Sequence, residues 1–153
     1  MDPEGVREAA RRAVIHKDIE TFPKGYQTEI GERGVMLSGG QKQRISIARA
    51  LMKQAPILIL DDCLSAVDAR TEKEIITNLR SYLEGRTSLL ITHRIFSLLD
   101  FDKIIVLEEG KIVEEGRHEA LMERKGVYFQ MYRRQQQEDV EGGNGANLAV
   151  EKT

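Results

Sequence analysis

The chain has 153 residues, of which 41% are hydrophobic and 31% charged, and its formal net charge at pH 7 is −2. This balance suits a soluble globular protein or part of one, and the lack of a global basic charge argues against nucleic acid as a partner. The longest apolar runs have the length of strands, so the sequence predicts no membrane span, and the single cysteine, Cys63, excludes an internal disulfide.

The first 36 residues predict two helices and a charged loop. Residues 1–16 have the pattern of an amphipathic helix, with Asp2 as its cap and Pro3 in its first turn. A second, short helix is expected to end at Pro23. Residues 28–34, TEIGERG, are rich in charge and glycine, which on physical grounds alone indicates a solvated loop.

LSGGQ, at residues 37–41, predicts a helix start that can hold a phosphate. A Ser that caps a helix and a Gln three residues later form a capping box, and glycines between them let a ligand approach the backbone. The free N–H groups and the positive end of the helix would then face the phosphate, although a plain loop-to-helix junction fits the same pattern. The apolar face of residues 42–52 indicates that the helix continues. The candidate ligand-binding residues are Leu37, Ser38, Gly39, Gly40 and Gln41.

The run ILIL at residues 57–60 is followed by two acids, Asp61 and Asp62. A continuous apolar run predicts a strand covered on both faces, as in the parallel sheet of an α/β protein. Ligands gather at the carboxyl ends of such strands, so two adjacent acids there favour a functional site over a solvated turn. Cys63 follows them, and we expect a small buried residue rather than a reactive thiol.

The second half of the chain predicts a helix, a strand, a hairpin and two more helices. SAVD at residues 65–68 precedes a helix at 69–83, and a second buried strand at 87–92 is followed by His93. Residues 103–113 predict a hairpin, and residues 117–123 and 126–136 predict short helices. The sequence turns polar near its end, which predicts disorder over residues 138–153.

LSGGQ, the basic helix after it, and the apolar strand that ends in acids together resemble the ABC-type ATPases, over about residues 4–137. The resemblance implies an α/β fold that is part of a P-loop NTPase domain, with a parallel sheet and flanking helices. Residues 1–52 would belong to its helical subdomain and residues 53–137 to its RecA-like core. ATP and Mg²⁺ are the implied cofactors, with LSGGQ as the signature motif.

The resemblance also assigns roles at the strand ends. Asp61 matches the Walker B aspartate that holds Mg²⁺, and Asp68 lies in the D-loop beside the nucleotide. His93 matches the switch histidine that contacts the γ-phosphate. Asp62 occupies the place of the catalytic base, where the family usually has Glu; a carboxylate one methylene shorter can lower the rate about 100-fold. Exporters with Asp here usually pair with a different subunit, so we expect the weaker catalytic site of a heterodimer.

The loop at residues 28–34 and the ending HEALMERKGVYFQMYRRQQ resemble the exporter branch of the family. This implies a contact with a transmembrane domain through Glu29, Glu32 and Arg33, and a second nucleotide-binding domain from another subunit. The implied function is ATP-dependent efflux, with the domain at the cytoplasmic face of the plasma membrane.

The phosphate-binding motif GxxxxGK[ST] of such ATPases does not occur in these 153 residues, where the one Gly-Lys pair is Gly110-Lys111. We therefore expect a C-terminal fragment of a longer exporter that does not bind or hydrolyse ATP alone. The strand that carries this motif would also be missing, which leaves a hydrophobic strand with an open edge and predicts poor solubility.

Two other function classes share the signature motif. The ABC ATPases of chromosome maintenance and repair clamp DNA, but they carry long coiled coils, and no sustained heptad pattern precedes the signature here. A non-catalytic protein could donate its signature motif in trans to the ATP of another subunit. Nothing in the sequence excludes this last alternative.

Overall fold

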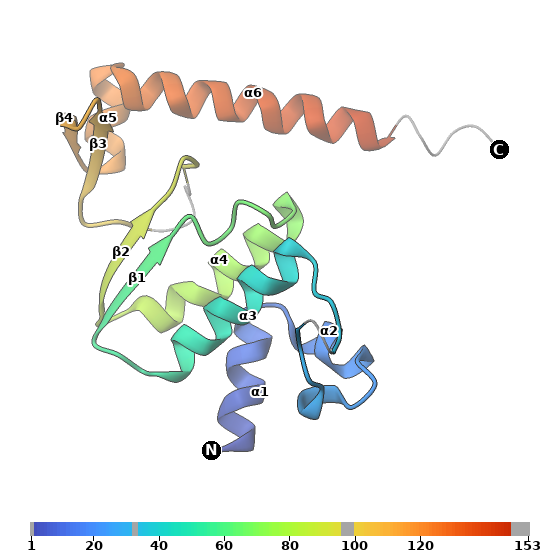
Figure 1. Cartoon of the computed structure of the whole chain (residues 1–153). Helices are drawn as coiled ribbons and strands as arrows, with labels where there is room; N and C mark the ends of the chain where they lie inside the picture. The colour runs from blue at the N-terminus through green and yellow to red at the C-terminus, as the bar shows by residue number, and fades with distance from the viewer. Residues whose placement is uncertain (1, 32–33, 96–99, 148–153) are drawn as a thin grey trace. The chain divides into compact units, whose positions relative to one another are not determined.

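The structure is a computed structural model that describes residues 2–31, 34–95 and 100–147. The chain divides into two compact units, Met1–His93 and Arg94–Thr153 (Figure 1). The first unit holds residues 1–52 together with β1 (Ile57–Asp61), α4 (Ala69–Leu83) and β2 (Thr87–Ile91).

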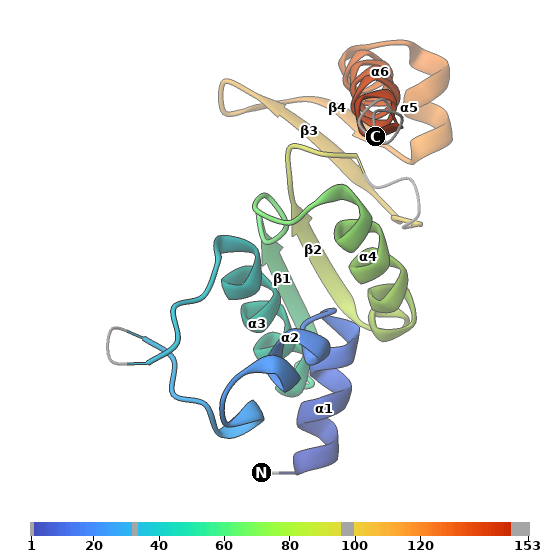
Figure 2. The same cartoon turned by 90° about the vertical axis from the view of Figure 1, so that its right-hand side faces the viewer.

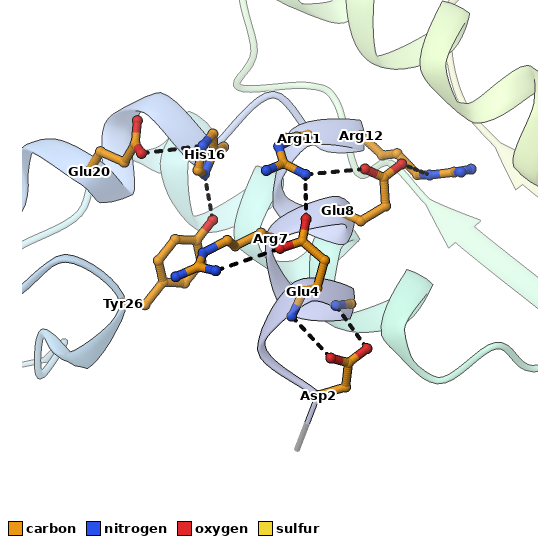
Figure 3. A network of polar contacts seen from close by, with 10 residues as sticks. Asp2, Glu4, Arg7, Glu8, Arg11, Arg12, His16, Glu20 and Tyr26 are labelled. Carbon is orange, nitrogen blue, oxygen red and sulfur yellow. Dashed lines mark hydrogen bonds and ion pairs between the residues drawn. The ribbon is translucent and has the colours of Figure 1, made fainter.

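The first unit begins with α1 (Pro3–Arg12), α2 (His16–Thr21) and the short 3₁₀ turn η1 (Gly25–Gln27). The carboxylate of Asp2 accepts hydrogen bonds from the backbone N–H groups of Glu4 and Gly5, which confirms the predicted cap. On the exposed side of α1, acidic and basic side chains of this helix form ion pairs with one another (Figure 3). α1 ends before Val14, whose φ of 54° is left-handed.

The core of the first unit is built from helices and one strand. α3 (Gly39–Met52) and α4 lie beside the parallel pair β1–β2 in both views (Figures 1 and 2). The Tyr82 hydroxyl donates to the Leu51 carbonyl at 2.9 Å, which ties α4 to α3. The fully buried side chains of the unit include Ile15, Ile47, Ile75, Ile76 and Leu79.

β1 is covered on one face only. Leu58 and Leu60 are 5% and 6% exposed, whereas Ile57 and Ile59 are each 60% exposed. The predicted cover on both faces is therefore wrong in the described part of the chain, because a two-stranded sheet with helices on one side leaves its other face open. β1 pairs with β2 alone among the described strands, so one edge of β1 is open, as expected.

The second unit is a hairpin followed by two helices. β3 (Ile104–Glu108) pairs antiparallel with β4 (Lys111–Gly116), and Glu109 and Gly110, both at positive φ, form the predicted tight turn. α5 is His118–Arg124 and α6 is Val127–Asn147. A small core joins them, made of Val106, Leu121 and Tyr128.

α6 extends further than the sequence predicted. The helix includes residues 138–147, where we expected disorder, and residues 148–153 lie outside the described part. The good helix formers Gln135, Gln136, Gln137 and Glu138 favour helix as far as residue 138, whereas the glycine-rich residues 141–147 have low helix propensity. No helix within the described ranges is both long enough and apolar enough to cross a membrane.

Candidate functional site

The start of α3 has the predicted capping box. The backbone N–H of Gln41 donates to Ser38 Oγ at 3.2 Å, and the backbone N–H of Ser38 donates to Gln41 Oε1 at 3.0 Å. The Ser38 carbonyl accepts the first bond of the helix from Lys42. Since Ser38 Oγ is an acceptor in this arrangement, its own hydrogen can still be donated to a ligand.

Gly39 and Gly40 have different neighbours. A Cβ at Gly40 would lie 2.7 Å from the carbonyl oxygen of Ala66, whereas a Cβ at Gly39 would lie 3.4 Å from the Ala66 side chain. Gly40 is thus needed for the close approach of α3 to the loop at residues 62–68. Sequence reasoning had assigned both glycines to ligand approach, so it missed the structural role of Gly40.

Gln43 joins α3 to the same loop. Its Nε2 donates to Ser65 Oγ at 2.9 Å and to the Asp62 carbonyl at 3.3 Å, while its Oε1 accepts from the Ala66 N–H at 2.9 Å. These bonds connect the signature helix to the loop after the double acid. Sequence analysis did not single out Gln43, because a polar residue in the second turn of a helix carries no local signal of a partner 22 positions away.

A depression of about 350 Å³ lies between the start of α3 and this loop. Two stretches that the sequence marked separately, LSGGQ and SAVD, therefore share one site. Leu37 and Gln41 are not among its lining residues, and Arg44, which the sequence did not mark, is. The depression is lined by Ser38, Gly39, Gly40, Arg44, Ala66, Val67 and Asp68.

Asp68 also has a structural role. Its Oδ1 accepts from the backbone N–H of Thr71 at 2.9 Å, which caps α4. The hydrogen bonds from Thr71 hold the pKa of the Asp68 carboxyl below its ordinary value. The carboxylate is charged at neutral pH, so it is an acceptor toward anything in the depression and would repel a phosphate brought directly against it.

The acids and the histidine gather at one end of the parallel pair. Asp61 lies opposite Ile91 in the register, and the Asp62 N–H donates to the Ile91 carbonyl at 2.9 Å. Both acids are exposed, and so is His93, which follows β2 by two residues. Since the strands are parallel, their carboxyl ends meet at the same edge, as the sequence predicted. Asp62 has a left-handed φ of 43°, a conformation that Asp tolerates better than most residues.

The carboxylates at this edge could bind Mg²⁺ only if phosphate oxygens supplied further ligands. Mg²⁺ takes one or two protein carboxylates and completes its octahedron with phosphate oxygens and water. Asp61 and Asp62 match that requirement, and the described residues contain no group of three or more His, Cys, Asp or Glu that could hold a metal by itself.

Cys63 follows these two acids directly. Burial raises the pKa of the Cys63 thiol, and the negative charges of Asp62 and Asp61 raise it further, so Cys63 is a poor nucleophile.

Asp18, on α2, contacts the signature helix directly. Gln41 Nε2 donates to Asp18 Oδ1 at 2.9 Å, and Arg44 donates to both carboxylate oxygens, at 2.9 and 3.3 Å. Arg44 also donates to the Val14 carbonyl. Burial alone would raise the pKa of the Asp18 carboxyl, but the hydrogen bonds from Gln41 and Arg44 and the charge of Arg44 outweigh it, and the pKa lies below its ordinary value. Sequence analysis missed Asp18 because its partners are distant in the chain.

The loop expected to meet a membrane domain is described in part. Glu29 is exposed, and the backbone bond from the Val35 N–H to the Glu29 carbonyl, 3.0 Å, closes the base of the loop. The other two residues assigned to this contact, Glu32 and Arg33, lie outside the described residues.

Comparison with known proteins gives one consistent result. Residues 2–65 match the family model described as "ABC transporter". The chain is 55% identical over 133 residues to the multidrug resistance-like ATP-binding protein MdlA of Escherichia coli (strain K12), an alignment that covers 87% of this chain and 22% of MdlA. It is 50% identical over 135 residues to the ATP-dependent lipid A-core flippase of Syntrophus aciditrophicus (strain SB), covering 88% of this chain and 22% of the flippase.

A solved structure agrees in fold as well as in sequence. The structure of a bacterial Atm1-family ABC exporter with ATP bound superposes with a TM-score of 0.76 at 44% identity, over 88% of this chain and 23% of that chain. The chain thus spans less than a quarter of the length of these relatives.

Proposed function

Because the chain is a portion of an ABC transporter nucleotide-binding domain related to the MdlA- and Atm1-type exporters, we propose that it works in the ATPase of such an exporter. Its part is to close an ATP site whose phosphate-binding loop another nucleotide-binding domain provides. The observation that carries this proposal is the depression in which Ser38, Gly39 and Gly40 meet the loop at residues 66–68. A helix start with free backbone N–H groups is suited to the outer oxygens of a phosphate.

The chemistry of each candidate residue determines the role that we propose for it. The Ser38 hydroxyl and the backbone N–H groups of Gly39 and Gly40 would bind phosphate oxygens of the nucleotide that the other domain holds. At the second ATP site, beside the carboxyl ends of β1 and β2, Asp61 would hold Mg²⁺, which when bound with ATP neutralises the phosphate charge. Asp62 would accept a hydrogen bond from the attacking water, and His93 would donate one to the terminal phosphate.

The rest of the assembly follows from the same relationship. We propose that a transmembrane domain contacts the loop that contains Glu29, and that a second nucleotide-binding domain, from a different subunit, faces the depression. The domain would then sit at the cytoplasmic face of the membrane, and ATP hydrolysis would drive export.

The test is the ATPase activity of the assembled transporter. Ser38→Arg places a bulky cation at the start of α3, and we expect the rate to fall at least about 100-fold, as when an enzyme loses one preorganised donor to a reacting oxygen. Lys42→Gln, which changes an exposed charge four residues away, is the matched control and should stay within twofold. Unchanged activity in Ser38→Arg would show that the depression does not face ATP.

A second variant tests the effect of Asp62, whose side chain is one methylene shorter than the Glu usual in the family. If Asp62 limits hydrolysis because its carboxylate is one methylene too short, Asp62→Glu should raise the turnover of the assembled transporter, by up to about 100-fold. Unchanged turnover would mean that the other ATP site of the dimer, and not the one that contains Asp62, limits the rate.

The purified chain alone separates this proposal from an independent ATPase. Residues 1–153 contain no GxxxxGK[ST] motif, so we expect no ATP hydrolysis and no nucleotide binding at millimolar concentration. If the chain instead stimulates the ATPase of a separate domain and Ser38→Arg abolishes the effect, it donates its signature motif in trans as a non-catalytic partner. An immunoblot of membrane and soluble fractions distinguishes a portion of a longer transporter from a separate trans-acting protein. Only the trans-acting protein would give a soluble band near 17.4 kDa.

A further inference from the structure

Three hydrogen bonds from the signature helix converge on one carboxylate of α2. Asp18 Oδ1 accepts from Gln41 Nε2 at 2.9 Å and from Arg44 Nη2 at 3.3 Å, and Asp18 Oδ2 accepts from Arg44 Nη1 at 2.9 Å. The side chains of Arg44 and Asp18 are 15% and 27% exposed, so the pair is partly shielded from water. The exposed ion pairs on α1 lack this shielding, since their side chains are 31% to 65% exposed.

The amide of Gln41 connects this carboxylate to the helix cap. Its Oε1 accepts from the Ser38 N–H while its Nε2 donates to Asp18. A carboxylate can only accept, so the amide group must face Asp18 with its nitrogen. The orientation that satisfies Asp18 is therefore the same one that completes the capping box, and without Asp18 the amide loses the contact that fixes its orientation.

Arg44 links the carboxylate to the depression. It is one of the lining residues, beside Ser38 and Gly40, yet its guanidinium is bonded to Asp18 and to the Val14 carbonyl. Asp18 thus holds the one cation of the lining against α2. Removing one partner of a shielded charge pair leaves the other without compensation, so Arg44 would have to find a new position.

α2 is itself fixed to the segment that leads into the loop at residues 28–34. His16 Nδ1 and the Tyr26 hydroxyl are 2.7 Å apart, and His16 Nε2 lies 3.4 Å from a carboxylate oxygen of Glu20 (Figure 3). One short helix therefore contacts both the turn before this loop and the start of the signature helix.

We propose that Asp18 is a positioning residue, which sets the geometry of the signature motif by orienting the Gln41 amide and holding the Arg44 guanidinium. The inference rests on the proposed function where it concerns ATP, and on the contacts alone where it concerns the geometry of Ser38 and Gln41.

The geometric part is tested by NMR of the full chain. We expect the Gln41 side-chain amide and the Ser38 backbone N–H to shift together as acid protonates Asp18, with a midpoint below that of an ordinary Asp. In Asp18→Asn, hydrogen exchange of the Ser38 and Gln41 backbone amides should become about tenfold faster. Glu20→Gln removes an exposed carboxylate from the same helix and should change these rates less than twofold.

Two outcomes would overturn the inference. One is a Gln41 amide signal in the unaltered chain that does not move between pH 2 and 6, a measurement that needs no variant and stands even if Asp18→Asn does not fold. The other is exchange at Ser38 and Gln41 that is the same in Asp18→Asn as in Glu20→Gln. Arg44→Lys, which keeps the charge but loses the two-point contact, should speed exchange less than Asp18→Asn does.

The functional part uses the assembled transporter. A positioning role predicts that Asp18→Asn raises the KM for ATP or lowers kcat at least tenfold, while Glu20→Gln does neither. If the unaltered assembly has no ATPase activity but the NMR result holds, the proposed function fails and the positioning of Ser38 stands. If activity is present and Asp18→Asn leaves it unchanged, Asp18 does not position the motif for ATP.

Discussion

Gly39 and Gly40 are adjacent in the sequence, but the structure gives them unequal tolerance to a side chain. Alanine adds a Cβ that would be 2.7 Å from the Ala66 carbonyl oxygen at Gly40, and 3.4 Å from the Ala66 side chain at Gly39. Both changes gain the helix preference of alanine, about 0.5–1 kcal/mol, so the difference between them isolates the clash.

We expect Gly40→Ala to lower the free energy of unfolding by about 1–3 kcal/mol relative to Gly39→Ala, the usual cost of overpacking. Urea unfolding followed by circular dichroism gives both values. Equal stability in the two variants would mean that the loop at residues 62–68 moves away at no cost.

Asp18 should make stability depend on pH in the acid range. Because its pKa is lower in the folded protein than in the unfolded chain, the folded state binds fewer protons, and acid favours unfolding. Its contribution is complete above about pH 4, the ordinary range of an Asp side chain, and is lost as pH falls through the lower folded pKa.

The corresponding measurement compares the unaltered chain with Asp18→Asn by urea unfolding at pH 3, 4, 5 and 6. We expect Asp18→Asn to be less stable by about 1–3 kcal/mol at pH 5–6, as for the loss of a hydrogen-bonded charge, and the difference to shrink toward pH 3. A difference that is constant with pH would assign the loss to shape rather than to charge.

Residues whose partners are close in sequence could be predicted, and those with distant partners could not. The Asp2 cap and the capping box of Ser38 and Gln41 involve contacts across two or three positions, which a motif records. Asp18 meets Gln41 across 23 positions, and Gln43 meets Ser65 across 22. Which polar residues meet in such pairs depends on how the helices pack, and no local pattern carries that information.

β1 offers a test at the scale of an element, because its two faces differ in burial while its residues are alike. Leu60 points into the core and is 6% exposed, whereas Ile59 is 60% exposed. We expect Leu60→Ala to lower the free energy of unfolding by about 2–5 kcal/mol, as for other large-to-small changes in a core.

Ile59→Thr is the matched change on the open face. Threonine keeps the branched shape that strands favour, so we expect a change within about 0.5 kcal/mol, together with less light scattering at high concentration. A loss as large as that of Leu60→Ala would show that something covers this face in solution.

The order and type of the elements followed from the sequence, and their surroundings did not. The helix expected at residues 69–83 has those bounds, and the hairpin turn lies at Glu109 and Gly110 as predicted. Burial of both faces of β1 was inferred from an apolar run, which shows that a strand can be buried but not what is present to cover it. The end of α6 lies beyond the predicted residue 136, because the polar and glycine-rich sequence that follows has no apolar periodicity to indicate a helix.

At the scale of the whole molecule, each of the two units presents apolar side chains to solvent. The open face of the β1–β2 pair includes Ile57, Ile59, Leu89 and Ile91, and the hairpin of the second unit exposes Ile105, Leu107, Ile112 and Val113. Contiguous apolar surface of this kind favours association, and an unpaired strand edge adds hydrogen-bonding groups to it. We therefore expect the isolated chain to self-associate as its concentration rises.

Lysine substitutions show which face is responsible. Leu89→Lys and Leu107→Lys each place a charge on one face, and each should weaken association about tenfold, equivalent to about 1.4 kcal/mol, when measured by sedimentation velocity. Gln130→Lys adds the same charge at an exposed position of α6 and controls for net charge. The double variant Leu89→Lys/Leu107→Lys should remain monomeric at concentrations where Gln130→Lys associates. If it associates as the unaltered chain does, neither apolar face forms the contact. If only Leu89→Lys has an effect, the face of the β1–β2 pair forms it alone.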